Sequence, residues 1–289
     1  MKIDRPTAID YWCNLFTPEG LRKLYLEPPE FAWVVKNWKV GGRLAGHAPD
    51  EFIRILDESG FAKAGIPTTK VYNYVGRHLV WDLRLEDVAP IVDRHPDRFF
   101  GLYGINPLLR MAGVRELEQA VREHNFIAAL MHPHGFGLPP NSREWFPFYA
   151  KCVELDIPVF TLVGHAAEEM PSEPGRPLHL DDVALYFPEL RIVGCSGWPW
   201  VEEMIAMSWK FRNVYYGTSQ YAPRHWTKEL RSFVAGRGAG KVLLGTGFPV
   251  LTHAQARAEV DEFGLTDSAL RQLLSETAAK VFGSRLGAP

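Results

Sequence analysis

Short apolar runs that alternate with helix-like segments constrain the fold of this chain more than any other feature. Eight runs have strand length, and they span residues 7–13, 65–75, 98–107, 125–135, 157–165, 191–197, 213–219 and 241–249. Such an alternation is typical of repeated βα units, whose strands pair in parallel. Eight units in one chain predict an α/β fold, a (β/α)8 TIM barrel, which typically takes about 250 residues.

An open, doubly wound sheet is the alternative architecture for the same alternation. It is disfavoured because no GxGxxG phosphate-binding sequence follows the first run. We interpret the chain as one domain over residues 1–289, with an inserted excursion at about 15–49. The excursion is rich in aromatic residues, proline and glycine, and we expect it to cover the barrel mouth as a lid.

Composition limits the partners of the chain. Hydrophobic residues make up 46% and charged residues 23% of the sequence, and the formal net charge is −2. Because no basic run occurs, neither nucleic acid nor a membrane surface is an expected partner. Three cysteines without an N-terminal apolar leader indicate free thiols and a cytoplasmic location. The expected partner is a small-molecule substrate, and a homodimer is a further candidate.

Active sites of TIM barrels lie at the carboxyl ends of the strands. The run 157–165 ends at His165, and the run 191–197 contains Cys195 near its end. We predict that His165 acts as a catalytic acid or base, because imidazole titrates near neutral pH. Cys195 is the second predicted catalytic residue, a nucleophile if His165 lowers its pKa. The alternative for Cys195 is a small, buried apolar side chain.

Further side chains at or near strand ends are predicted to bind the substrate. They are Trp12, Asn14, His132, His134, Arg77, Trp198, Ser219 and Thr246. Trp12 offers a flat wall for stacking, although an apolar plug is an equal alternative. The two histidines belong to an HPHG turn and have a loop-forming role as their alternative. Arg77 can pair with a substrate carboxylate, or it is a solvated surface arginine.

Longer stretches of the sequence follow a recognisable pattern. They are HPDRFFGLYGINP, HPHGFGLPP, FYAKCVELDIPVF, PSEPGRPLHLDDVALYFPELRIV, GWPWVEEMIAM, RNVYYGTS, KVLLGTGFP and ETAAKVFG. Together they resemble the amidohydrolase superfamily, in particular the branch related to aminocarboxymuconate semialdehyde decarboxylase. The resemblance implies a (β/α)8 barrel that usually holds one divalent metal. It also implies decarboxylation or hydration of unsaturated and aromatic carboxylates, or hydrolysis of ring lactones.

The metal ligands that the resemblance implies are mostly absent from this sequence. The implied His-x-His of the first strand falls on Trp12 and Asn14, the implied sixth-strand histidine on Cys195, and the implied eighth-strand aspartate on Gly247. His165 alone is kept. One imidazole does not hold a catalytic zinc, which takes about three protein ligands. The sequence therefore predicts that the protein has no metal cofactor.

These residues predict a metal-independent, amidohydrolase-related enzyme. It would be a lyase, decarboxylase, isomerase or cyclase that acts on a conjugated or aromatic small molecule, with His165 as acid or base. One alternative is a non-catalytic barrel that binds a small molecule or a partner protein. The other is a metal-dependent hydrolase or decarboxylase with a rearranged zinc site made of His132, His134, His165 and Cys195.

Overall fold

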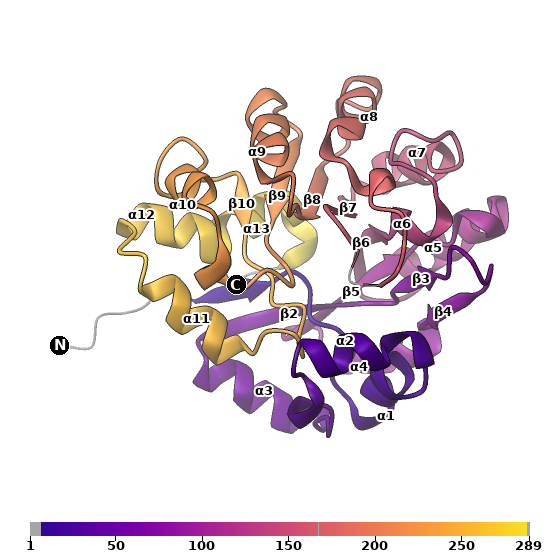
Figure 1. The fold of residues 1–289 in the computed structure, drawn as a ribbon, viewed down its shortest axis with the longest axis horizontal. Helices are drawn as coiled ribbons and strands as arrows, with labels where there is room; N and C mark the ends of the chain where they lie inside the picture. The colour runs from indigo at the N-terminus through magenta and orange to yellow at the C-terminus, as the bar shows by residue number, and fades with distance from the viewer. Residues whose placement is uncertain (1–6, 167, 288–289) are drawn as a thin grey trace.

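Eight parallel strands form one sheet that curls into a barrel (Figure 1). The computed structural model describes residues 7–166 and 168–287. The strands are, in their order around the sheet, β1 (Ala8–Asp10), β2 (Phe61–Pro67), β5 (Phe99–Gly104), β6 (Phe126–Met131), β7 (Val159–Val163), β8 (Ile192–Ser196), β9 (Val214–Gly217) and β10 (Val242–Leu243). Every pairing between neighbours in this order is parallel. The predicted TIM barrel is confirmed.

Backbone hydrogen bonds join the first strand to the segment that follows the last one. The N–H of Tyr11 donates to the carbonyl of Leu244 (3.4 Å), and the N–H of Gly247 donates to the carbonyl of Trp12 (2.8 Å). An open sheet would leave both of these edges unpaired. The doubly wound alternative is therefore wrong.

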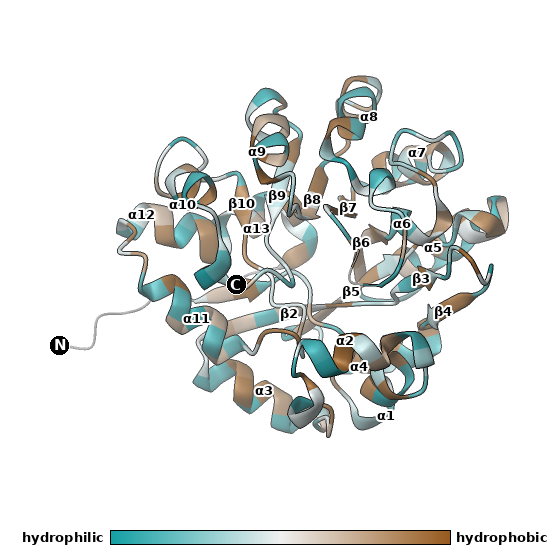
Figure 2. Ribbon diagram, viewed as in Figure 1, coloured by the Kyte–Doolittle hydropathy of each residue, from teal (hydrophilic) through white to brown (hydrophobic). Residues whose placement is uncertain are grey.

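Helices surround the barrel, and the ribbons of most of them carry both hydrophobic and hydrophilic residues (Figure 2). They are α1 (Pro18–Leu21), α2 (Ala32–Asn37), α3 (Pro49–Glu58), α4 (Leu85–Arg94), α5 (Met111–Glu123), α6 (Pro133–Phe136), α7 (Phe146–Glu154), α8 (Leu180–Tyr186), α9 (Val201–Lys210), α10 (Lys228–Ala235), α11 (His253–Asp261), α12 (Asp267–Arg271) and α13 (Thr277–Phe282). Within the described ranges, no helix is both long enough and apolar enough to cross a membrane.

Two elements differ from the sequence-based expectation. The predicted strand 65–75 divides, because a proline cannot donate a ladder hydrogen bond and β2 ends at Pro67. The chain then forms a hairpin of β3 (Lys70–Tyr72) and β4 (Leu79–Asp82) outside the barrel sheet. The helix α11 was not predicted at all. Its start is capped by Thr252, whose hydroxyl accepts a hydrogen bond from the N–H of Gln255 (3.2 Å).

The barrel interior is filled and is closed at its amino-terminal end. The ring of Phe282, at the end of α13, packs between Phe100 and Phe160 with centroid distances of 4.9 Å and 5.4 Å. All three side chains are buried in one apolar cluster. Because this end is sealed by side chains, the functional site must be sought at the carboxyl ends of the strands.

The excursion at 15–49 packs against the hairpin through aromatic side chains. The rings of Tyr25 and Phe31 lie 5.2 Å and 4.5 Å from the ring of Trp81 on β4. The indole N–H of Trp81 also donates to the carbonyl of Leu24. These contacts fix aromatic side chains of the excursion over the barrel mouth.

Candidate active site at the barrel mouth

A small cavity lies at the barrel mouth. Its volume is about 50 Å³, and its lining combines aromatic side chains with polar side chains from the strand ends: Trp12, Tyr25, Phe31, Trp38, Thr69, Trp81, His132, Leu162, His165, Glu168, Ser196 and Gln220. We call it the inner cavity. Two of the predicted substrate-binding residues, Trp12 and His132, line it together with the predicted catalytic His165.

A larger chamber, of about 680 Å³, adjoins the inner cavity. Four residues line both spaces: Trp38, His165, Ser196 and Gln220. Lys39, Arg43 and Arg224 are also in the wall of this outer chamber, and no acidic side chain lines it within the described part of the chain. A volume of this size fits an ordinary small-molecule ligand, and the wall favours an anionic one.

His165 lies where the two spaces meet. Its backbone N–H donates to the carbonyl of Trp198 (2.9 Å), and its ring meets the Trp198 ring edge-on at 4.9 Å. The side chain of His165 is exposed, and Trp198, another predicted substrate-binding residue, lines the outer chamber. An imidazole at this position can exchange protons with solvent and still reach a substrate.

His132 and His134 are held neutral. Burial, and then the neighbouring imidazole of His134, lowers the pKa of His132 to about 3. Burial lowers the pKa of His134 to about 4, and its Nε2 lies 2.9 Å from the carbonyl oxygen of Gly164. Among the described residues, Nδ1 of His132 has no hydrogen-bond partner. His132 therefore presents an uncharged polar ring to the inner cavity.

The two lowered pKa values predict that acid destabilises the fold. In the unfolded chain both imidazoles bind protons near pH 6.5, whereas in the folded protein they do so only near pH 3 and 4. This stability is present above pH 6.5 and is lost as the pH falls below it. We expect a slope of roughly 1 kcal/mol per pH unit for each group between pH 6.5 and 5. Urea melts over this range should show a shallower slope for His132→Asn than for His78→Gln, an exposed control.

The structure does not bring the other predicted residues to the cavities. Cys195 is buried in the apolar barrel interior, where burial raises its pKa to about 12. A thiol of that pKa is inert at neutral pH, so its position matches the apolar alternative rather than the nucleophile. Arg77 lies at the tip of the β3–β4 hairpin and stacks on Tyr74 at 5.0 Å. The remaining ones, Asn14, His134, Ser219 and Thr246, are buried behind the cavity wall.

Three cavity residues have a left-handed backbone although they are not glycine. They are Lys39 (φ 54°), Ser196 (φ 78°) and Gln220 (φ 60°). This conformation costs of order 1 kcal/mol per residue and tends to occur at functional sites. A side chain at Gly247 would lie 2.3 Å from Cγ of Gln220. Gln220 therefore occupies the space next to the position where the resemblance implied an aspartate.

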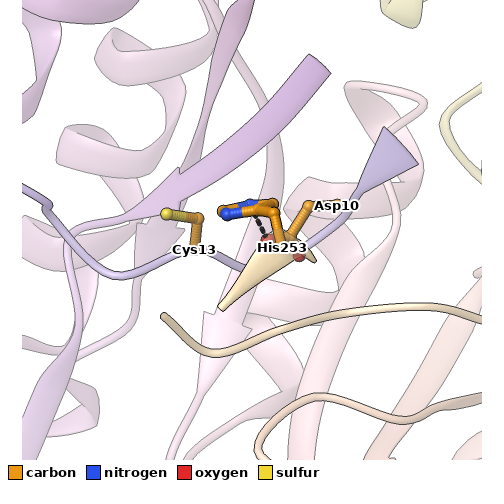
Figure 3. Close-up of side chains that lie close together, drawn as sticks. All are labelled: Asp10, Cys13 and His253. Atoms are coloured by element: carbon orange, nitrogen blue, oxygen red, sulfur yellow. Dashed lines mark hydrogen bonds and ion pairs between the residues drawn. The ribbon is translucent and has the colours of Figure 1, made fainter. Parts of the chain in front are cut away.

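A buried group of three potential metal ligands lies beside β1 (Figure 3). The ligand atoms of Asp10, Cys13 and His253 lie within 4.8 Å of one another, and all three side chains are fully buried. Nε2 of His253 lies 2.9 Å from Oδ2 of Asp10. Asp10 also accepts hydrogen bonds from Thr246 and from the N–H of Trp12. Burial, and then the charge of Asp10, raises the pKa of the Cys13 thiol.

The sequence profile of the family described as Amidohydrolase matches residues 9–284. The chain belongs to this family. The resemblance found in the sequence is thus confirmed, and the barrel mouth is the part of an amidohydrolase barrel where its active site is expected.

One relative of this amidohydrolase matches it over a short stretch, and one solved structure of the same fold has low sequence identity to it. A 2-keto-4-carboxy-3-hexenedioate hydratase from Sphingobium sp. is 38% identical over 79 residues, which cover 25% of this chain and 23% of that protein. The chain thus matches about a quarter of that relative's length. An uncharacterised TIM-barrel protein from Bordetella bronchiseptica has 18% identity, a TM-score of 0.78, and coverage of 98% and 100% of the two chains.

A further solved structure with this fold contains a metal. It is 5-carboxyvanillate decarboxylase from Novosphingobium aromaticivorans with bound manganese and 3-methoxy-4-hydroxy-5-nitrobenzoic acid. Identity is 15%, the TM-score is 0.69, and coverage is 96% of this chain and 97% of that one. At such low identity the likeness shows the fold.

The prediction that this amidohydrolase has no metal cofactor is contradicted. The manganese-bound structure of the same fold and the Asp10, Cys13 and His253 group both oppose it. These three residues fit a metal, because they offer a carboxylate, a thiol and an imidazole, and because Nδ1 of His253 is buried without a partner in the described residues. Asp10 and Cys13 were not among the metal ligands that the sequence suggested.

The sequence offered one usable signal for the missed ligand. Thr252 and Gln255 have the spacing of a helix-capping box, which places a helix start at His253. His253 would then follow the last strand closely, at the mouth end of the barrel. Other missed cavity residues, such as Thr69 and Glu168, carried no comparable signal because isolated polar residues are common in loops.

Proposed function

We propose that this amidohydrolase is a metal-dependent lyase, of the decarboxylase or hydratase type, that acts on a conjugated or aromatic carboxylate. One observation carries the proposal: the imidazole of His165 lies between a small cavity lined by aromatic and polar side chains and a ligand-sized chamber with cationic side chains in its wall. Relatives named as a hydratase and as a decarboxylase are consistent with it. Both reaction types move a proton on a conjugated carbon frame.

The residues that line the inner cavity and the outer chamber have different roles in substrate binding and proton transfer. The rings of Trp38 and Trp198 offer apolar faces to a flat substrate, while Lys39 and Arg43 supply positive charge for its carboxylate. His165 exchanges a proton with the carbon frame. His132, held neutral by burial, gives a directed hydrogen bond without adding charge.

Asp10, Cys13 and His253 would hold the metal. A divalent cation there would supply positive charge close to the end of β1, behind the wall formed by Trp12. Thiolate ligands select zinc rather than manganese, which favours oxygen ligands. The donor set therefore favours zinc in this chain.

The proposed metal site leads to a prediction about the zinc content of the protein. We expect purified protein to contain about one zinc per chain, and Cys13→Ser and His253→Gln each to lose most of it, because two protein ligands hold zinc poorly. Elemental analysis by mass spectrometry measures this. Cys152→Ser, which removes another buried thiol, on α7, is the control. Full metal content in the Cys13 and His253 variants would show that the ion lies elsewhere.

The activity itself is tested with a panel of aromatic and conjugated carboxylates. Purified protein, loaded with zinc or with manganese, is incubated with each compound, and products are identified by mass spectrometry. The proposal expects loss of carbon dioxide or a change by one water for at least one compound, and slower turnover after a chelator. Binding without product across the panel would favour a non-catalytic barrel.

A further inference from the structure

We infer that the inner cavity is a water site formed by Thr69 and His132, and that the substrate carboxylate lies in the outer chamber at Lys39. The enzyme would then add water to a conjugated carbon–carbon double bond, or remove it. This inference rests on the proposed function and chooses the hydratase type over the decarboxylase type.

The volume of the inner cavity limits what it can hold. Its volume is about 50 Å³. A water molecule takes up about 30 Å³ in the liquid, whereas a cavity that binds benzene measures roughly 150 Å³. The ring or conjugated frame of a substrate therefore belongs in the outer chamber, and the inner cavity accepts a water-sized group.

The polar atoms of the inner cavity suit water. Oγ1 of Thr69 and Nδ1 of His132 are buried and have no hydrogen-bond partner among the described residues. Thr69 is 1% exposed and His132 5% exposed, and both line the cavity. A hydroxyl and a neutral imidazole can each donate or accept a hydrogen bond, and a buried water needs two to four such partners.

The charges of the two spaces orient the substrate. Lys39 and Arg43 are among the residues that line the outer chamber, and no acidic side chain lines it within the described residues. Lys39 is exposed and makes no ion pair within the described ranges. A substrate carboxylate is therefore attracted to the outer chamber.

The hydration step follows from this placement. The oxygen of the water at Thr69 and His132 bonds to the β-carbon of the conjugated system, and the π electron pair moves onto the α-carbon and its carbonyl. Glu168 accepts the proton that water loses, and His165 delivers a proton to the α-carbon. One water is consumed, and no electrons are exchanged with another compound. To complete the cycle, Glu168 releases its proton to solvent and exposed His165 regains one from solvent.

The decisive experiment compares the two chemistries on one panel. Unsaturated 2-oxo carboxylic acids and aromatic carboxylates are incubated with the metal-loaded enzyme in water labelled with heavy oxygen. The inference expects products that gain one labelled water, with carbon dioxide not released. Release of carbon dioxide, with no gain of water by the organic product, would overturn the inference and leave the proposed lyase intact. If no compound is turned over by either chemistry, the proposed function fails, and the inference fails with it.

Variants test the two binding roles separately. Thr69→Val keeps the shape of the side chain and removes the hydroxyl, so kcat should fall about tenfold or more with little change in KM. Lys39→Ala should raise KM about tenfold with kcat nearly unchanged, whereas Lys36→Ala, on α2 and outside both cavities, should match the wild type. Equal KM values for the two lysine variants would contradict the carboxylate assignment, and an unchanged kcat for Thr69→Val would contradict the water site.

Discussion

Replacing His165 with glutamine should lower kcat by about two to four orders of magnitude, the usual contribution of a general acid or base. Glutamine retains a polar side chain of similar length but cannot exchange a proton near neutral pH. His165 lies on the wall shared by the inner cavity and the outer chamber, and its backbone is fixed through Trp198. KM should change little, because other residues contact the carboxylate and the aromatic face of the substrate.

The measurement is a steady-state comparison of the variant with the wild type, both loaded with the same metal. His124→Gln is the matched control. His124 follows the last residue of α5 and pairs with Asp93, and it lines neither cavity of the mouth. Urea melts should show similar stability for the three proteins, because the His165 side chain is exposed. A kcat within a few-fold of the wild type would remove His165 from the mechanism.

The barrel could be predicted from sequence because its strands are buried on both sides. Such strands appear as continuous apolar runs, for example in 157–165, and the helices between them keep a separate periodicity. The hairpin of β3 and β4 was missed because its residues continue the run that begins with β2, and a single proline, Pro67, marks the break. The excursion was recognised by composition, but its contact with Trp81 is a tertiary feature.

The site could be predicted only in part. His165 and Trp12 follow directly after strands, so their placement at the mouth follows from the fold. Cys195 does too, yet it points into the interior while its neighbour Ser196 lines the cavity. Successive side chains of a strand face opposite sides, and the sequence does not show which side each residue of β8 takes.

The group of metal ligands could not be predicted from the sequence, for a different reason. Asp10 and His253 are 243 positions apart, and their contact depends on barrel closure and on the short helix α11. The resemblance directed attention to the ends of the strands, where Trp12 and Asn14 form a hydrogen-bonded pair of their own (3.0 Å). A ligand set behind that pair has no local sequence signature, apart from the capping residues that mark the start of the helix with His253.

Replacing Asp10 with alanine should lower the free energy of unfolding by about 3–5 kcal/mol, the usual cost of removing one partner of a buried charged network. The carboxylate accepts hydrogen bonds from the N–H of Trp12, from the N–H and hydroxyl of Thr246, and from His253. All of these groups are buried and would lose their acceptor. The network also ties β1 to the segment after β10, so the barrel closure itself is weakened.

Urea melts in the presence and absence of a chelator separate the two possible origins of this stability. If the hydrogen bonds dominate, chelated wild type remains more stable than Asp10→Ala; if a bound metal dominates, chelation lowers the wild type to the level of the variant. Glu58→Ala, an exposed acidic residue at the end of α3, is the control and should change stability by less than about 0.5 kcal/mol. Wild-type stability in Asp10→Ala under both conditions would show that neither the network nor a metal at this group supports the closure of the barrel.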